Sequence, residues 1–263
     1  MYYGMRSGHR PFNTPIRFRG KSQAGIVGEM IMEADEIVGR ILDQLAASGI
    51  DDDTIVLFMS DNGADGSAYY AEKDFGHLQH GVDINDESIK LRGQKNFNYE
   101  AGHRLPFLWR YPARWQQRVV DDPTMPVSYL DVYRTLGDII GAEIPCNEAP
   151  DSRSILSLLD GTEPTDQLKN SKIITHAKKG ARLAFRKRQW KWIPEDNALF
   201  NLEKDVTEEF NLVQYEWGRE FAQGLNESMN SIVDFIANRE DVTQEGKIAE
   251  CFLNPFDSFQ PTF

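Results

Sequence analysis

The stretch from Asp53 to Gly63 constrains this chain most, because it has the pattern of a buried strand that ends in a polar turn. Residues 54–59 are Thr-Ile-Val-Leu-Phe-Met, apolar or β-branched without alternation. That pattern is typical of a strand buried on both faces, as in a parallel sheet covered by helices. Ser-Asp-Asn-Gly follows at once, and Gly63 has the conformational freedom that a tight turn needs. We therefore predict an α/β fold with residues 60–63 at the carboxyl end of a buried strand.

Asp61 and Asn62 lie where open α/β sheets usually bind ligands, beyond the carboxyl end of a strand. A carboxylate and an amide oxygen are hard donors that suit Ca²⁺ or Mg²⁺. The same two residues also suit an Asx-type turn that only closes the strand. The acidic triplet 51–53 comes before the strand, on the order of 20 Å from Asp61. It cannot share an ion with Asp61, and we interpret it as a solvated loop.

Residues 24–48 show the periodicity of an amphipathic helix. Its apolar positions recur at steps of three and four: Ile26, Val27, Met30, Ile31, Ala34, Ile37, Val38, Ile41, Leu42 and Leu45. Gly49 suits the residue that follows a helix end. A helix, a short loop and the strand at 54–59 together form an α/β unit.

Composition and charge narrow the class of protein. The chain has 263 residues, of which 40% are hydrophobic, so it can bury a sizeable core. Its formal charge of −12 argues against a general nucleic-acid binder. The sequence has no run of 18 apolar residues, which predicts no membrane-spanning helix. The first residues lack the charged start and apolar middle of a signal peptide, and we expect the chain to begin inside a fold.

The histidines and cysteines leave several interpretations open. His9 sits in a loop rich in glycine and proline, where a lone histidine is usually a surface residue. His77 and His80 are three residues apart and could be metal ligands on one helical turn, although a polar loop is the simpler interpretation. Cys146 and Cys251 fit no zinc motif and could form one bridge or remain two thiols.

Three cations, Arg92, Lys95 and Arg104, lie in a loop punctuated by glycines. Such a loop suits an oxyanion ester, because cations and backbone N–H groups must offset the charge of the substrate. The alternative is a set of ordinary surface cations on an acidic protein.

The last hundred residues differ from the rest of the chain in the pattern of their apolar segments. Short apolar segments at 173–175, 182–186, 190–193 and 199–202 predict an antiparallel sheet. A helix at 216–238 presents one apolar face, formed by Phe221, Leu225, Met229, Ile232 and Phe235, that would cover this sheet. A polar linker at 161–171 precedes the sheet. We therefore predict an α/β domain over residues 1–165 and a small second domain over residues 166–263.

A series of motifs in a fixed order resembles one family. His-x-Pro at residue 9 is followed by the helix, the strand ending in Ser-Asp-Asn-Gly, and Leu-Arg-Gly-x-Lys at 91–95. Then come Tyr-Glu-x-Gly-His-Arg-x-Pro-Phe, Pro-Val-Ser-x-Leu-Asp and Asn-Leu-Glu-x-Asp-x-x-Glu-x-x-Asn-Leu. From about Gly8 to Leu212 the chain resembles the C-terminal half of the type I, formylglycine-dependent sulfatases of the alkaline phosphatase superfamily. The resemblance implies part of a three-layer α/β/α fold, followed by a small antiparallel sheet under a helix.

The resemblance also implies roles for particular residues. Asp61 and Asn62 correspond to Ca²⁺ ligands, and Lys95 corresponds to the lysine that binds the sulfate. His9 corresponds to the histidine that contacts the sulfate and protonates the leaving oxygen, which makes His9 and Lys95 the catalytic and substrate-binding candidates. A histidine can donate a proton near neutral pH. Three further motif residues, Arg92, Glu100 and Arg104, are assigned to structural support of the loop.

The chain also departs from the family pattern in one feature that bears on its activity. No Cys-x-Pro-x-Arg occurs in the chain, so the formylglycine nucleophile is expected only in a preceding part of the fold. We therefore expect the chain to be a fragment of a sulfatase. The complete protein would act on sulfated small molecules or glycans, and the fragment would associate through exposed sheet surface. The alternatives are a phosphodiesterase or phosphonate monoester hydrolase of the same superfamily, and a non-catalytic protein that binds sulfated glycans. Family members are often periplasmic, secreted or lysosomal, which leaves the localisation of this chain open.

Overall fold

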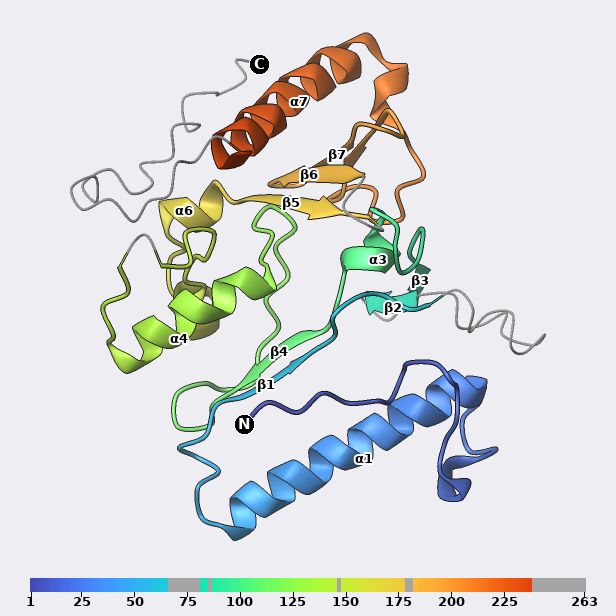
Figure 1. Cartoon of the computed structure of the whole chain (residues 1–263), viewed down its shortest axis with the longest axis vertical. Helices are drawn as coiled ribbons and strands as arrows, with labels where there is room; N and C mark the ends of the chain where they lie inside the picture. Colours follow the sequence, from blue (N-terminus) through green and yellow to red (C-terminus); the bar gives the residue numbers. More distant parts are fainter. Residues whose placement is uncertain (66–80, 85–86, 146–147, 178–181, 238–263) are drawn as a thin grey trace. The chain divides into compact units, whose positions relative to one another are not determined.

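The structure, a computed structural model, describes residues 1–65, 81–84, 87–145, 148–177 and 182–237 (Figure 1). The chain forms two compact units, residues 1–117 and residues 118–263, and each is described here by itself. The division into domains at 165/166 stays a prediction. Both cysteines, Cys146 and Cys251, lie outside the described residues.

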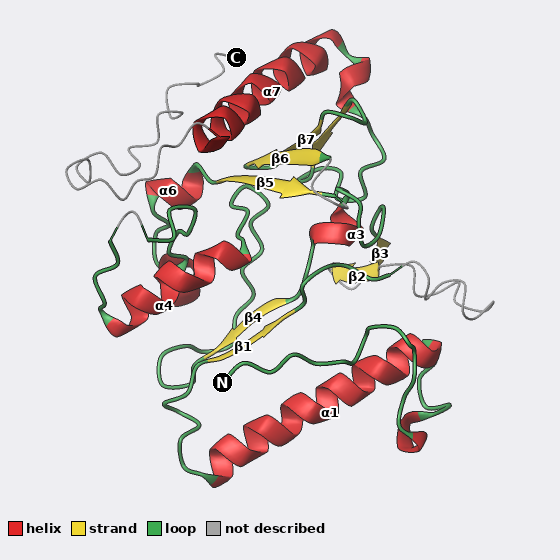
Figure 2. Cartoon of the chain, in the orientation of Figure 1, coloured by secondary structure: helices red, strands yellow, loops and turns green. Residues whose placement is uncertain are grey.

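The first unit contains one long helix and short strands (Figure 2). Its elements are η1 (Ile16–Phe18), α1 (Gly25–Ala47), β1 (Val56–Met59), β2 (Gly81–Ile84), β3 (Glu87–Lys90), α3 (Glu100–His103) and β4 (Phe107–Arg110). Helix α1 confirms the predicted helix at 24–48, and Gly49 follows it with a φ of 69°. That left-handed conformation carries little steric cost in glycine, which has no Cβ.

The prediction that β1 is a buried strand of parallel type is wrong for the described residues. Strand β1 pairs antiparallel with β4, in a register that places Val56 opposite Arg110 and Met59 opposite Phe107. The side chains of Val56, Leu57 and Phe58 are half-buried, whereas that of Met59 is exposed. The apolar run correctly predicted a strand. It did not determine the direction of the neighbouring strand, because that depends on the connection and not on side-chain pattern.

The long connection after β1 contains a hairpin that the sequence analysis did not predict. Strands β2 and β3 pair antiparallel, with Gly81 opposite Lys90 and Ile84 opposite Glu87. Residues 66–80 and 85–86 lie outside the described residues, and so do His77 and His80.

Three glutamates on α1 hold the segment that precedes the helix. Glu29 is buried, and it accepts hydrogen bonds from Thr14 Oγ1 at 2.9 Å and from the backbone N–H of Gly20. Glu33 accepts one from Ser7 Oγ at 3.1 Å. Glu36 pairs with Arg17 at 2.7 Å. These acceptors at positions i, i+4 and i+7 face one side of the helix, so the N-terminal loop is fixed along it.

The second unit begins with short helices and ends with a sheet under a helix. Its elements are η2 (Tyr129–Asp131), α4 (Val132–Ile140), α5 (Leu156–Asp160), α6 (Asp166–Lys169), β5 (Lys172–His176), β6 (Leu183–Lys187), β7 (Trp190–Ile193), β8 (Ala198–Asn201), η4 (Leu212–Gln214) and α7 (Glu216–Ala237). The polar segment at 161–171, predicted to be a linker, contains α6. Thr165 caps this helix, and its Leu168 is fully buried.

The predicted antiparallel sheet and its covering helix are confirmed. The strands are ordered β5-β6-β7-β8, and each pair is antiparallel. One face of the sheet forms the core with η4 and α7. The buried residues of this core are Phe185, Trp192, Leu199, Val213, Ala222, Leu225 and Met229. At about 1.5–3 kcal/mol for each large apolar side chain, this burial dominates the stability of the unit.

The motif at 201–212 is structural in this unit. The carboxylate of Asp205 accepts hydrogen bonds from the backbone N–H groups of Glu209 and Phe210. Glu208 forms a buried ion pair with Lys191 at 2.8 Å. Asn211 accepts a hydrogen bond from the backbone N–H of Leu199 at 3.1 Å. The motif therefore joins the connection after β8 to the sheet.

Among the described helices, none is both long and apolar enough to cross a membrane.

Candidate functional site

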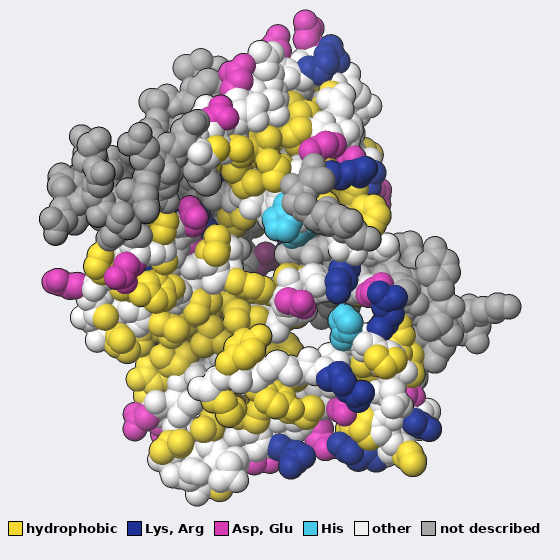
Figure 3. All heavy atoms as spheres, in the orientation of Figure 1, with side chains coloured by type: hydrophobic (Ala, Val, Ile, Leu, Met, Phe, Trp, Pro, Cys, Tyr) yellow, Lys and Arg dark blue, Asp and Glu magenta, His cyan; other side chains and the backbone are white. Residues whose placement is uncertain are grey.

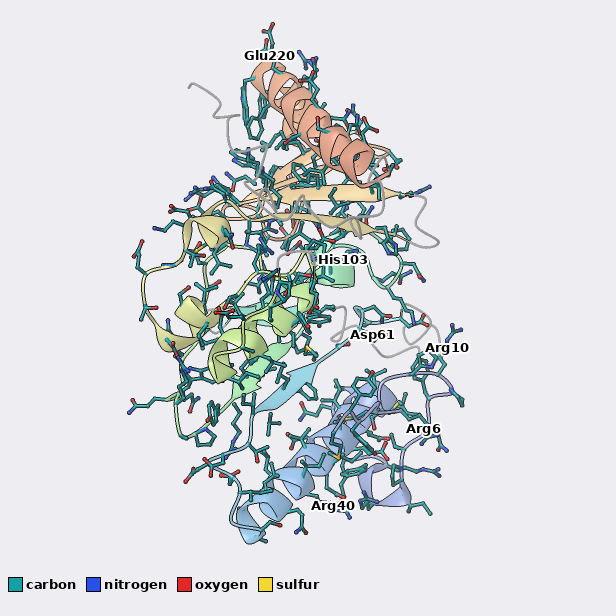
Figure 4. The ribbon with its side chains drawn as sticks, turned by 60° about the vertical axis from the view of Figure 1, so that its left-hand side comes forward. Arg6, Arg10, Arg40, Asp61, His103 and Glu220 are labelled. Atoms are coloured by element: carbon teal, nitrogen blue, oxygen red, sulfur yellow. The ribbon has the colours of Figure 1, made fainter. Side chains whose placement is uncertain are left out.

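Asp61 and Asn62 form a turn directly after β1, at the position expected for ligand-binding residues. Ser60 Oγ donates to the carbonyl of Asn62 at 2.9 Å, and Asn62 Nδ2 donates to the carbonyl of Gly63 at 2.9 Å. The amide group of Asn62 is thereby oriented, with Oδ1 as its remaining acceptor. The Asp61 side chain is exposed beyond the end of β1 (Figure 4). Two oxygen donors are therefore presented side by side at this turn.

Gly63 allows this turn to approach the loop that carries Lys95. A Cβ on residue 63 would lie 1.7 Å from the carbonyl oxygen of Ala101. The Gly63 N–H donates to the carbonyl of Gly102 at 3.1 Å, and the Lys95 N–H donates to the carbonyl of Ala64 at 2.9 Å. Lys95 itself and Gly102, further along the same loop, are thus hydrogen-bonded to the residues that follow Asp61 and Asn62.

The loop at 92–104 is held by its own contacts. The guanidinium of Arg92 lies 4.1 Å from the centre of the Tyr99 ring. The buried Glu100 pairs with Arg104 at 3.0 Å. Gly93 has a φ of 83°, which few other residues adopt at low cost. These contacts agree with the supporting role expected for Arg92, Glu100 and Arg104, and they fix the loop around Lys95.

His9 lies on the segment that precedes α1. Its ring Nδ1–H donates to the carbonyl of Arg10 at 2.8 Å, which leaves Nε2 as the nitrogen that can exchange a proton with a ligand. Its backbone N–H donates to the carbonyl of Arg6 at 3.1 Å. The next residue, Arg10, pairs with Asp65 through Nε and Oδ2 at 3.1 Å. The His9 segment is therefore linked to the same turn that carries Asp61.

Positive charge is concentrated near His9. Residues 1–28 contain no Asp or Glu, and their cations are Arg6, Arg10, Arg17, Arg19 and Lys21. Figure 3 shows Lys and Arg side chains gathered over the part of the first unit that includes this segment. Two of these cations are offset by carboxylates, since Arg10 pairs with Asp65 and Arg17 with Glu36.

Two features of this region were missed by the sequence analysis. The ion pair between Arg10 and Asp65 joins residues that no periodicity relates. Asp51, interpreted as part of a solvated loop, instead pairs with Arg110 at 2.7 Å and joins the start of β1 to the end of β4. Asp52 and Asp53 are exposed, as expected. Within the described residues, no cluster of three or more His, Cys, Asp or Glu side chains could hold a metal ion.

Comparisons with known proteins identify the family. The family model described as Sulfatase matches residues 1–142, more than half of the chain. The chain belongs to the sulfatase family.

The relatives agree with this assignment. The chain is 31% identical over 202 residues to an N-acetylgalactosamine-6-O-sulfatase of Bacteroides thetaiotaomicron, covering 75% of this chain and 37% of that protein. It is 31% identical over 156 residues to human arylsulfatase D, covering 59% of this chain and 24% of that protein. The matched part of the chain thus spans between about a quarter and little more than a third of the length of these relatives.

Solved structures support the alkaline-phosphatase-like fold. One solved structure comes from work on the metabolism of multiple glycosaminoglycans by Bacteroides thetaiotaomicron. The match covers 85% of this chain and 48% of the chain in that structure, with a TM-score of 0.66 and 27% identity. The phosphonate monoester hydrolase of Agrobacterium radiobacter matches 80% of this chain and 40% of its own, with a TM-score of 0.54 and 23% identity. The second likeness concerns the fold alone. The named relatives are sulfatases, so the phosphodiesterase and glycan-binding alternatives are not favoured.

Proposed function

We propose that this chain provides the metal-binding turn, the sulfate-binding lysine and the proton donor of an enzyme that hydrolyses sulfate esters. The observation that carries the proposal is the hydrogen bond from Lys95 to Ala64, since it joins the cationic loop to the turn of Asp61 and Asn62. The ion pair between Arg10 and Asp65 adds the His9 segment to the same region.

The oxygen donors of Asp61 and Asn62 are of the chemical type that binds a divalent metal. Asp61 offers an exposed carboxylate, and the Nδ2 hydrogen bond of Asn62 leaves its amide oxygen as a second hard donor. Calcium takes six to eight oxygen ligands, so these two residues would supply only part of its coordination. When bound, Ca²⁺ would polarise the oxygens of the sulfate.

The remaining roles follow from the chemistry of the side chains. The ammonium group of Lys95 would bind a sulfate oxygen and offset its negative charge. His9, protonated on both ring nitrogens, would hold its Nδ1–H on the carbonyl of Arg10 and give its Nε2 proton to the leaving oxygen. The overall reaction takes ROSO₃⁻ and water to ROH, sulfate and one proton. The nucleophile is a separate requirement, because no Cys-x-Pro-x-Arg occurs in residues 1–263.

The substrate class that we propose is a sulfated sugar. Support comes from the relative named as an N-acetylgalactosamine-6-O-sulfatase and from the solved structure that belongs to work on glycosaminoglycan metabolism.

The test is a turnover assay on residues 1–263 joined behind the nucleophile-bearing part of the Bacteroides relative and co-expressed with a formylglycine-generating enzyme. We expect hydrolysis of an aryl sulfate in the presence of Ca²⁺. Changing Lys95 or Asp61 to Ala should lower kcat/KM for this substrate by at least about a hundredfold, the scale of a lost charge-stabilising group. Changing His9 to Ala should lower kcat/KM by a similar factor for an alkyl sulfate, whose poor leaving group needs a proton. Full activity of all three variants would refute the proposed site.

A further inference from the structure

The segment that carries His9 and the turn that carries Asp61 are separated by about fifty residues, yet a side-chain ion pair joins them. Arg10 directly follows His9, and Asp65 is four residues beyond Asp61. The Arg10 Nε and Asp65 Oδ2 atoms lie 3.1 Å apart. Figure 4 shows Asp61 just beyond β1 and Arg10 on the segment before α1.

The two ends of this ion pair are held differently. On one side, Ala64 accepts the Lys95 N–H and Gly63 donates to Gly102, so Asp65 follows directly on a pinned backbone. On the other side, the Arg10 side chain is 58% exposed, against 23% for Asp65. Asp65 thus extends from a backbone held by hydrogen bonds, whereas Arg10 is the more exposed member of the pair.

The imidazole of His9 depends on the backbone of Arg10. His9 Nδ1–H donates to the Arg10 carbonyl at 2.8 Å, so a displacement of residue 10 turns the ring and moves Nε2. A half-exposed ion pair contributes only about 0.2–1 kcal/mol to folding, which is too little to explain the pair as a major source of stability. A displacement of about 1 Å at a catalytic group is far more costly to the rate of a reaction.

We propose that Arg10 and Asp65 form a positioning pair that sets His9 against the Asp61 and Lys95 loops for proton donation. The role in proton donation rests on the proposed function, whereas the positioning of His9 by this pair can be tested without turnover. Neither residue is assigned to contact the reacting atoms.

The first experiment measures amide hydrogen exchange by mass spectrometry on residues 1–263. Arg10→Ala and Asp65→Asn should each speed exchange in the peptide covering residues 6–13 by about two- to fivefold, with an unchanged melting temperature. The charge-swapped double variant, Arg10→Asp with Asp65→Arg, should restore slow exchange. Arg17→Ala is the matched control, because it breaks the Arg17–Glu36 pair in the same segment but should leave exchange at residues 6–13 unchanged. Unchanged exchange in the Arg10 and Asp65 variants would overturn the proposal.

The second experiment uses the joined enzyme of the turnover assay. Arg10→Ala should slow hydrolysis of an alkyl sulfate by at least about tenfold and that of 4-nitrophenyl sulfate by less than about twofold, because only the poor leaving group needs a proton. An equal effect on both substrates would refute the role in proton donation. If the joined enzyme has no activity, the proposed function fails, while the exchange experiment still decides whether the pair positions His9.

Discussion

Lys191 and Glu208 form an ion pair inside the second unit, with Nζ and Oε1 2.8 Å apart and with side chains 5% and 0% exposed. Removing the carboxylate deprives a buried ammonium of this ion pair. We expect Glu208→Ala to lower the free energy of unfolding by about 3–5 kcal/mol in urea titrations. Replacing both charges, with Lys191→Met and Glu208→Leu, should recover much of the loss.

The matched control for this prediction is the exposed pair of Lys204 and Glu203, with a distance of 3.7 Å. Glu203→Ala should change the free energy of unfolding by less than about 1 kcal/mol. Equal losses in the Glu203 and Glu208 variants would contradict the importance of burial.

Gly63 is predicted to be essential for the turn that carries Asp61. In Gly63→Ala the new Cβ would meet the Ala101 carbonyl, which the backbone must avoid by moving. We expect a loss of about 1–3 kcal/mol in the free energy of unfolding, by analogy with overpacked cores. Gly39→Ala in α1 meets no neighbour within 4 Å and should raise stability by up to about 1 kcal/mol. A neutral Gly63→Ala variant would show that the two loops do not approach each other as described.

The pairing of Asp51 with Arg110 predicts a dependence on pH. The hydrogen bond from the Arg110 guanidinium lowers the pKa of Asp51 from its ordinary value of 3.8. A carboxyl with a lowered folded-state pKa stabilises the fold fully above its unfolded value and loses this contribution as pH falls through the folded-state value. The protection factors of the amides at residues 51–59, which are the intrinsic exchange rates at each pH divided by the observed rates, should therefore fall as pH drops below about 4 in the wild type. Asp51→Asn should show lower protection factors already at pH 6 and a smaller pH dependence, and an identical pH profile would contradict the assignment.

Residues 1–263 alone should not turn over sulfate esters. The chain lacks the family's nucleophile motif, and neither cysteine is followed by x-Pro-x-Arg. The check is a long incubation of the purified chain with an aryl sulfate and excess Ca²⁺, beside the joined enzyme. Turnover by the chain alone that disappears in Lys95→Ala or His9→Ala would show that the motif is dispensable.

The sequence predicted those features that depend on local pattern. Periodicity located α1 and α7, closely spaced apolar segments located β5 to β8, and the Ser-Asp-Asn-Gly motif located the turn after β1. It did not reveal the antiparallel pairing of β1 with β4, because a run of apolar side chains carries no information on the direction of the next strand.

Long-range contacts explain the other differences. Gly63 was predicted for its backbone freedom, yet its lack of a Cβ is needed for close approach to Ala101. The Arg10–Asp65 and Asp51–Arg110 pairs join charged residues whose partners lie more than fifty positions away. A single sequence does not indicate which of many opposite charges meet.

We infer that His9 lies beside the proposed metal-binding turn of Asp61 and Asn62, and paramagnetic broadening by Mn²⁺ tests this inference most directly. In spectra of residues 1–263 labelled on histidine rings, His9 is assigned by its loss in His9→Ala. With only two protein oxygens identified, metal affinity should be weak, in about the millimolar range or worse. The account predicts that Mn²⁺ broadens the His9 Hε1 signal, and that Asp61→Ala removes this effect while Asp53→Asn preserves it. A His9 signal that stays sharp, or that broadens equally without Asp61, would contradict the account.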